Sequence, residues 1–78
     1  MKVVIAKVNE NLFDGEAASM TLPGAEGQLT VLPEHMPLIT TLKEGVITVR
    51  PGGDEPEQTF AILGGVLEVR QDGATVIL

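Results

Sequence analysis

The stretch that decides the fold reads Leu22-Pro-Gly-Ala-Glu-Gly-Gln-Leu-Thr-Val-Leu-Pro-Glu-His-Met-Pro-Leu38. It places two proline-bounded turns around one short segment, and it contains the only histidine of the chain. Pro23-Gly24 fits the central pair of a type II turn, because proline fixes φ at the first position and glycine accepts positive φ at the second. The stretch is therefore predicted to be a dense region of turns around a short strand, too regular for an ordinary loop.

On both sides of this stretch, apolar and polar residues alternate with the two-residue period of half-buried strands. The pairs predicted to share an apolar face are Ile47 with Val49, Phe60 with Ile62, and Leu67 with Val69. Lys2 to Asp14 is free of glycine and proline, and its β-branched run Val3-Val4-Ile5 favours a strand over a helix. The periodicity therefore indicates strands along nearly the whole chain.

Glycine and proline separate these strands at intervals typical of a small all-β domain. Asp72-Gly73 predicts a tight hairpin with positive φ, joining Val66–Arg70 to Ala74–Leu78. Pro51 to Asp54 predicts a polar connection, and Gly64-Gly65 suits a corner between two sheets. An all-β chain of 78 residues must hide its apolar faces by closing on itself, so we expect a single domain, a small antiparallel sandwich or flattened barrel.

Composition excludes several classes of function. The net charge of −6 and the two aromatic residues argue against nucleic acid, which requires a cationic surface and often stacking aromatic rings. The same charge disfavours an anionic membrane surface. The chain has no cysteine, which favours a reducing compartment, and its first apolar run is too short for a signal peptide or a membrane span. We therefore expect a cytoplasmic protein without direct membrane insertion.

The search for chemistry finds no convincing site. His35 would need a nucleophile or an orienting acid, for which only distant residues such as Ser19 or Asp54 are candidates, so we interpret it as a structural or interface residue. A solvated loop histidine is the next alternative. The pair Gly24 and Gly27 lacks the remainder of a phosphate-binding motif, and no metal-ligand spacing exists. We predict no catalytic residue, cofactor, metal or small-molecule substrate.

Apolar residues crowd the central stretch and its flanks. They are Met20, Leu22, Val31, Leu32, Met36, Leu38 and Ile39. Either the core takes all of them or some form an exposed patch, and exposed patches with adaptable methionines mark protein contacts. The scattered acidic residues form either an ordinary solvated surface or a surface matched to a basic partner.

These segments, taken in order, resemble the N-terminal β-sandwich domain of the epsilon subunit of F-type ATP synthase. The matching segments are Leu12–Glu16, Leu22–Gly27, Leu32–Leu38, Leu42–Val46, Phe60–Val69 and Ala74–Leu78. The resemblance implies a ten-stranded flattened barrel of two antiparallel sheets. It implies a noncatalytic rotor subunit of the central stalk that binds the gamma subunit and the c-ring and couples ion translocation to ATP synthesis. It also implies a place at the periphery of the inner face of the cell membrane.

Carried over by position, the resemblance assigns the partner interface to two segments. The ring-facing loop would be Glu26, Gly27, Gln28, Leu29 and Thr30, and the segment beside gamma and the ring would include Pro33, His35, Met36, Pro37 and Leu38. Gln28 stands where an acidic residue is common in the family, and Thr30 where glycine is common. The family usually continues into a helical hairpin, so we expect residues 1–78 to be one β-sandwich domain with that hairpin absent.

Two alternatives come from other classes of protein. A lipoyl or biotinyl carrier domain is also small, acidic and all-β, but it needs a lysine at a hairpin tip, and Thr41-Leu-Lys-Glu-Gly45 lacks that setting for Lys43. A small hydrolase would depend on Ser19. The leading interpretation remains the noncatalytic rotor subunit.

Overall fold

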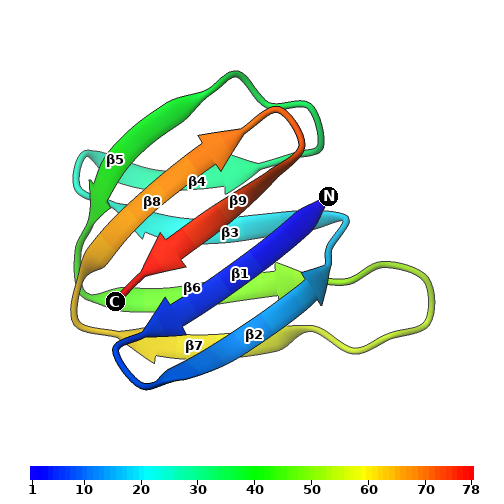
Figure 1. The fold of residues 1–78 in the computed structure, drawn as a ribbon, viewed down its shortest axis with the longest axis horizontal. Coiled ribbons are helices and arrows are strands. Elements are labelled where there is room, and N and C mark those ends of the chain that lie inside the picture. Colours follow the sequence, from blue (N-terminus) through cyan, green and yellow to red (C-terminus); the bar gives the residue numbers. More distant parts are fainter.

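The computed structural model describes residues 1–78, which form nine β-strands and no helix (Figure 1). The strands are β1 (Lys2–Lys7), β2 (Glu10–Glu16), β3 (Ser19–Gly24), β4 (Gly27–Val31), β5 (Leu38–Leu42), β6 (Gly45–Arg50), β7 (Gln58–Ile62), β8 (Gly65–Arg70) and β9 (Gly73–Ile77). The all-β class predicted from the alternation is confirmed.

The nine strands form one hydrogen-bonded sheet that curls into two walls. Its order is β2-β1-β9-β8-β5-β3-β6-β7, with β4 added on β3. We call β5, β8, β9, β1 and β2 the first wall and β4, β3, β6 and β7 the second wall, and Figure 1 shows the first in front of the second. The structure corrects the expectation of ten strands in two antiparallel sheets, since it has nine strands. The Gly24–Leu42 pair joins β3 to β5, so the strands form one sheet, and the β1–β9 pair is parallel.

The structure differs from the prediction at two turns: one predicted turn is displaced, and one turn interrupts a segment predicted as a strand. Pro23 and Gly24 are inside β3, and the chain reverses at Ala25 and Glu26 before Gly27, whose φ is 131°. Proline is tolerated there because the carbonyl of Pro23 accepts a hydrogen bond from the backbone of Lys43 (2.9 Å), while its missing N–H is not needed by any pairing. The segment from Lys2 to Asp14 is two strands, β1 and β2, with a turn at Val8 and Asn9.

The predicted hairpin between β8 and β9 is present, but the reason for its glycine is different. Gln71 and Asp72 form the turn, and Gly73 begins β9 without positive φ. A Cβ on Gly73 would collide with the backbone carbonyl of Lys2, because β9 lies directly beside β1 in the parallel pair. The corner at Gly64-Gly65 is confirmed, since the chain passes there from β7 at the sheet edge to β8 between β5 and β9.

The core lies between the two walls and consists of aliphatic side chains from alternate strand positions. Ile47 and Val49 of β6 are fully buried, and Leu67 and Val69 of β8 face them from the first wall. This confirms the two-residue period, since the intervening residues of both strands are at least partly exposed. Fourteen buried hydrophobic residues form one cluster, with Phe13 and Phe60 partly buried against it.

The two ends of the sheet are closed by packing. β2 and β7 end the strand order and form no pair with each other, but Phe13 and Phe60 meet in an edge-to-face arrangement with ring centroids 6.3 Å apart. Edge-to-face aromatic pairs contribute about 0.5–1.5 kcal/mol beyond their buried area. The aromatic pair therefore holds β2 and β7 together along the closing seam, which is the line where these two strands meet without hydrogen bonds.

We expect Phe60→Ala to lower the free energy of unfolding by about 2–3 kcal/mol, less than for a fully buried phenylalanine. Thermal and urea unfolding followed by far-ultraviolet circular dichroism measures this loss, since the chain has no tryptophan or tyrosine. In a double-mutant cycle with Phe13→Leu the two changes should be coupled by about 1 kcal/mol. Additive effects would show that the aromatic contact does not fasten the seam.

Candidate functional site

The structure provides no catalytic arrangement around the histidine. His35 is partly exposed, and its Nδ1 donates a hydrogen bond to the carbonyl of the adjacent Met36 (2.8 Å). Its ring makes no hydrogen bond with Ser19 or Asp54, the partners that a nucleophilic or acid–base site would require. The only hydrogen bond of the ring is local, to the next residue of the same loop.

Two segments that the sequence assigned to a partner interface line the same hollow. This hollow of about 300 Å³ lies between the turn before β4, β4 itself and the loop leading to β5. Its lining residues are Gly24, Glu26, Gly27, Gln28, Leu29, His35, Leu38 and Thr40. The structure thus brings Glu26–Leu29 together with His35 and Leu38, whereas Thr30, Pro33, Met36 and Pro37 lie outside the hollow.

The loop from Leu32 to Pro37 contains a tight turn. The backbone N–H of His35 donates to the carbonyl of Leu32 (3.2 Å), with Pro33 and Glu34 between them. Glu34 has φ of 64° and is the only non-glycine residue of the chain with positive φ. Proline followed by positive φ characterises a type II turn, and a non-glycine residue in that conformation costs about 1 kcal/mol relative to glycine. A type II turn thus lies at Pro33-Glu34, where none was predicted, whereas the one predicted at Pro23-Gly24 is absent because both residues lie in β3.

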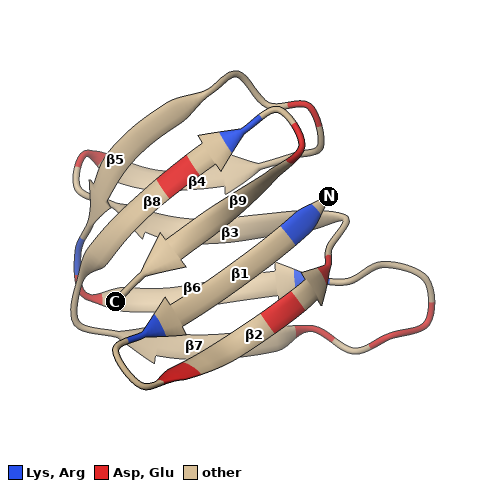
Figure 2. Cartoon of the chain, in the orientation of Figure 1, with Lys and Arg blue, Asp and Glu red and all other residues tan.

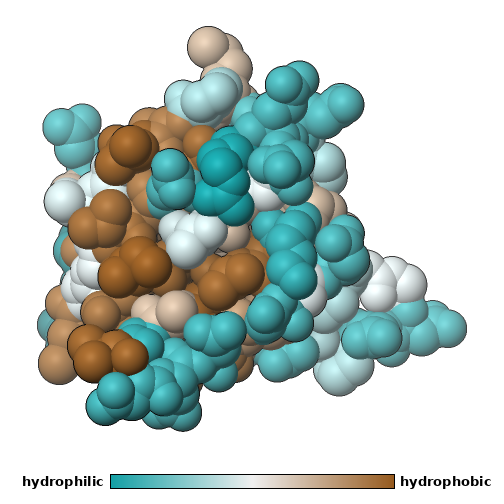
Figure 3. Space-filling view, in the orientation of Figure 1, coloured by the Kyte–Doolittle hydropathy of each residue, from teal (hydrophilic) through white to brown (hydrophobic).

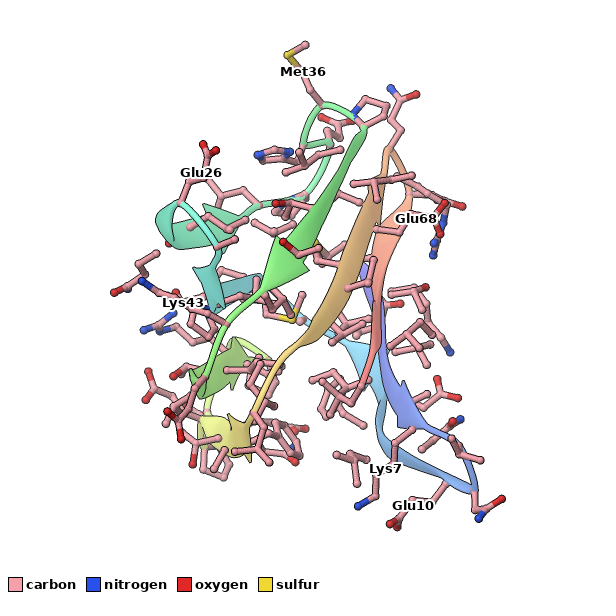
Figure 4. All side chains as sticks on the ribbon, turned by 90° about the vertical axis from the view of Figure 1, so that its left-hand side faces the viewer. Lys7, Glu10, Glu26, Met36, Lys43 and Glu68 are labelled. Atoms are coloured by element: carbon pink, nitrogen blue, oxygen red, sulfur yellow. The ribbon has the colours of Figure 1, made fainter.

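The apolar residues of the central stretch divide between core and surface. Met20, Leu22 and Val31 are fully buried. Met36 and Leu32, by contrast, are 79% and 55% exposed. Figure 4 shows the side chain of Met36 pointing away from the ribbon at the end of the loop between β4 and β5. The sequence left both outcomes open, and the structure shows that each applies to part of the set.

A second exposed apolar surface was missed by the sequence reasoning. We define the outer apolar face as Ile39, Leu63, Val66 and Ile77, which lie on β5, β8 and β9 or, for Leu63, just before β8. Val66 and Ile77 face each other across the β8–β9 pair, and Figure 3 shows apolar side chains over this part of the first wall. The available signal was that Val66 and Ile77 are apolar at strand positions where the alternation calls for polar residues.

The outer apolar face has no charged side chains beside it apart from one ion pair, Arg70 with Glu68. Figure 2 shows acidic residues in most loops and on β2 and β8, with no basic patch. Arg70 binds Glu68 at 3.0 Å on β8, next to the apolar residues. The hydrogen bond from Lys2 to Asp14, reinforced by their opposite charges, raises the pKa of Lys2 on the far strand of the first wall. The surface accordingly offers apolar contact and negative charge.

A larger hollow of about 460 Å³ lies over β3 and β6 on the second wall, lined in part by Lys43 and Arg50. Arg50 is already occupied, because it donates to Thr21 (2.8 Å) and pairs with Glu57 (2.9 Å). Lys43 is the one basic side chain without an ion pair. One free cation is too little for a phosphate cradle, and Lys43 sits at the corner between the walls and not at a hairpin tip.

No other feature points to bound chemistry. No group of three or more histidine, cysteine, aspartate or glutamate side chains is placed to hold a metal ion. No helix of the structure could cross a membrane. The remaining hollow, of about 360 Å³ between β2 and the β6–β7 loop, is lined by Asp14, Glu16 and Glu55 among others.

Comparison with known proteins indicates one family of β-sandwich domains. A family model described as the ATP synthase, Delta/Epsilon chain, beta-sandwich domain matches residues 1–78. An ATP synthase epsilon chain from Herminiimonas arsenicoxydans is 38% identical over 77 residues, and one from Halorhodospira halophila is 39% identical over 77 residues. Each alignment covers 99% of this chain and 55% of the relative, so the chain spans about half the length of these relatives.

Solved structures show the same fold. A chain of the mitochondrial ATP synthase from Euglena gracilis, in a structure of OSCP, F1 and c-ring, aligns with a TM-score of 0.87 at 22% identity, covering 96% of this chain and 48% of that one. A chain of the Tetrahymena thermophila mitochondrial ATP synthase, from its central stalk and c-ring, aligns with a TM-score of 0.79 at 17% identity, covering 97% and 60%.

Proposed function

The chain belongs to the family of ATP synthase delta/epsilon chain β-sandwich domains, and we propose that it is a noncatalytic subunit of the central stalk of an F-type ATP synthase. In that role it binds the gamma subunit and the c-ring and helps couple ion translocation to ATP synthesis. Its place is at the inner face of the cell membrane, peripheral and within the complex. The curated relatives named epsilon chain support this proposal across 99% of the sequence.

The observation that carries the proposal is the set of exposed apolar side chains in the loop from Leu32 to Pro37 and on the outer apolar face. The loop with Leu32 and Met36 runs directly into β5, whose Ile39 begins the outer apolar face. Isolated exposed apolar residues are common, but several of them on one wall and in its adjoining loop are typical of a protein contact. A rotor subunit needs such a surface because it transmits torque through contacts alone.

We assign three parts of the domain surface to the two partners. The turn and strand from Glu26 to Thr30 face the c-ring, and the segment from Pro33 to Leu38 lies beside gamma and the ring. The outer apolar face docks on gamma. The hollow that joins Glu26–Leu29 with His35 and Leu38 supports the placing of the first two parts side by side, both close to the ring.

The proposal is tested by assembly. The purified chain is mixed with an ATPase core that contains gamma but lacks epsilon, and the mixture is separated by size exclusion. Co-elution of the chain with the core at a one-to-one ratio with gamma is the expected result. If the chain elutes alone while an authentic epsilon chain co-elutes, the proposed function is wrong.

His35→Ala is expected to weaken assembly about threefold to tenfold while leaving the fold intact. The reason is that the ring organises the loop through its bond to Met36 and contributes little to the core. Affinity for the gamma-containing core and the melting temperature of the isolated domain are measured together. A large fall in melting temperature would identify His35 as a structural residue of the fold instead.

A further inference from the structure

The turn at Pro33-Glu34 contains the one residue of the chain that carries a side chain although its backbone has a conformation that favours glycine. Glu34 adopts positive φ, a conformation that glycine accepts without strain. Four glycines of this chain, such as Gly27 and Gly53, occupy the same side of φ space. Glu34 is therefore an exception within a chain that otherwise uses glycine for this conformation.

The domain gains nothing internally from the carboxylate of Glu34. The residue is exposed, and its side chain makes no ion pair and no hydrogen bond. The turn itself is closed by backbone atoms of Leu32 and His35, so its geometry does not depend on the glutamate side chain. Backbone strain that no contact within the domain offsets indicates that the residue functions in a contact outside the domain.

The surroundings of Glu34 indicate what kind of function this is. Leu32 precedes the turn and Met36 follows it, and both side chains are exposed. A carboxylate set between two exposed apolar side chains is suited to a contact in which the apolar groups exclude water around an ion pair. Exclusion of water strengthens the attraction between opposite charges, so a cation is the partner that this arrangement selects.

We propose that Glu34 is a specificity-determining contact of the rotor subunit, pairing with a lysine or arginine of the gamma subunit, because the Leu32–Pro37 loop runs into β5 and the outer apolar face assigned to gamma. Leu32 and Met36 pack around this pair in the complex. The inference rests on the proposed function and deepens it by assigning a cationic group to the partner surface. Glycine at this position would give a more stable domain that binds its partner less tightly.

The test compares Glu34→Gly, which removes both strain and charge, with Glu34→Gln, which keeps the strain and removes only the charge. Glu55→Gln, in the distant loop between β6 and β7, is the matched control for the loss of one negative charge. Glu34→Gly is expected to raise the melting temperature by about 4–8 °C. The two glutamine variants are expected to melt close to the parent chain.

Binding is measured at low and high salt, against a gamma-containing ATPase core and separately against a detergent-solubilised rotor of gamma and c-ring. Both Glu34 variants are expected to bind about tenfold more weakly at low salt, and most of this difference should remain at high salt, because a pair shielded from water is screened little. Glu55→Gln is expected to bind like the parent chain. Loss in both arms supports a cation on gamma, and loss only with the rotor overturns the inference, because the cation would then lie on the c-ring.

The inference is overturned if Glu34→Gln binds as tightly as the parent chain, or if Glu55→Gln loses as much affinity. It is also overturned if Glu34→Gly weakens binding but Glu34→Gln does not, because loop geometry would then be the cause. Failure of the parent chain itself to bind either assembly would instead reject the proposed function. The two failures are therefore distinguishable.

Discussion

Replacing Gly73 with alanine is expected to lower the free energy of unfolding by about 3 kcal/mol or more, a large part of the stability of a domain this small. The added Cβ would collide with the backbone carbonyl of Lys2. Neither strand can yield easily, because β1 is held by β2 on its other edge and β9 by β8. Relief requires breaking the parallel β1–β9 pair, which completes the first wall.

Urea denaturation followed by far-ultraviolet circular dichroism measures this loss. Gly15→Ala is the matched control, since Gly15 lies in β2 and a Cβ there would meet only the Phe13 ring, at an ordinary contact distance of 3.6 Å. The control is expected to change stability by less than about 1 kcal/mol. Equal stabilities for Gly73→Ala and the parent chain would show that the β1–β9 pair is not tightly held.

Ile77→Lys is expected to reduce the affinity for a gamma-containing core more than about a hundredfold, because an unpaired charge would be buried in an apolar contact. Ile77 lies beside Val66 on the outer apolar face. It is 54% exposed in the free domain, so the substitution should leave the fold and the melting temperature nearly unchanged.

Affinity is measured by surface-immobilised binding, with circular dichroism as the check on folding. Thr59→Lys is the matched control, because Thr59 is an exposed strand residue on β7 of the second wall. The control is expected to bind normally. Normal binding by Ile77→Lys would remove the outer apolar face from the interface, and equal losses by both variants would indicate a general effect of added positive charge.

Much of the fold is encoded locally and was predictable. The alternation placed Ile47, Val49, Leu67 and Val69 on the buried face, as the structure confirms. What the sequence did not reveal depends on pairing between distant strands. Pro23-Gly24 has the composition of a turn, yet it lies in β3 because β4 pairs along that segment. Local propensity therefore gave way to tertiary pairing.

The same limit applies to Gly73 and to the strand count. Gly73 follows an aspartate in the pattern of a hairpin turn, and only the approach of β1 from the far end of the sequence reveals why glycine is needed. Likewise, a resemblance can imply two antiparallel sheets, but the Gly24–Leu42 pair that makes one continuous sheet is a single contact between separate segments.

The interface role of the two contiguous segments stays a prediction, but their position in the sequence was enough to point to them. The segments around Glu26 and His35 were identified in advance, and the structure adds that they share one hollow. The outer apolar face was not identified, because Ile39, Val66 and Ile77 come from three strands and gather only in the folded sheet. The sequence does not single out Glu34, because a backbone dihedral angle cannot be read from residue type.

The parallel β1–β9 pair also bears on how the chain folds during synthesis. β1 is made first, but one of its two neighbours, β9, leaves the ribosome about seventy residues later. Until then, β1 can form only its hairpin with β2, and an isolated hairpin is marginally stable in water. High contact order slows folding, so the nascent chain should remain open, and in need of protection from aggregation, until its last strand has emerged.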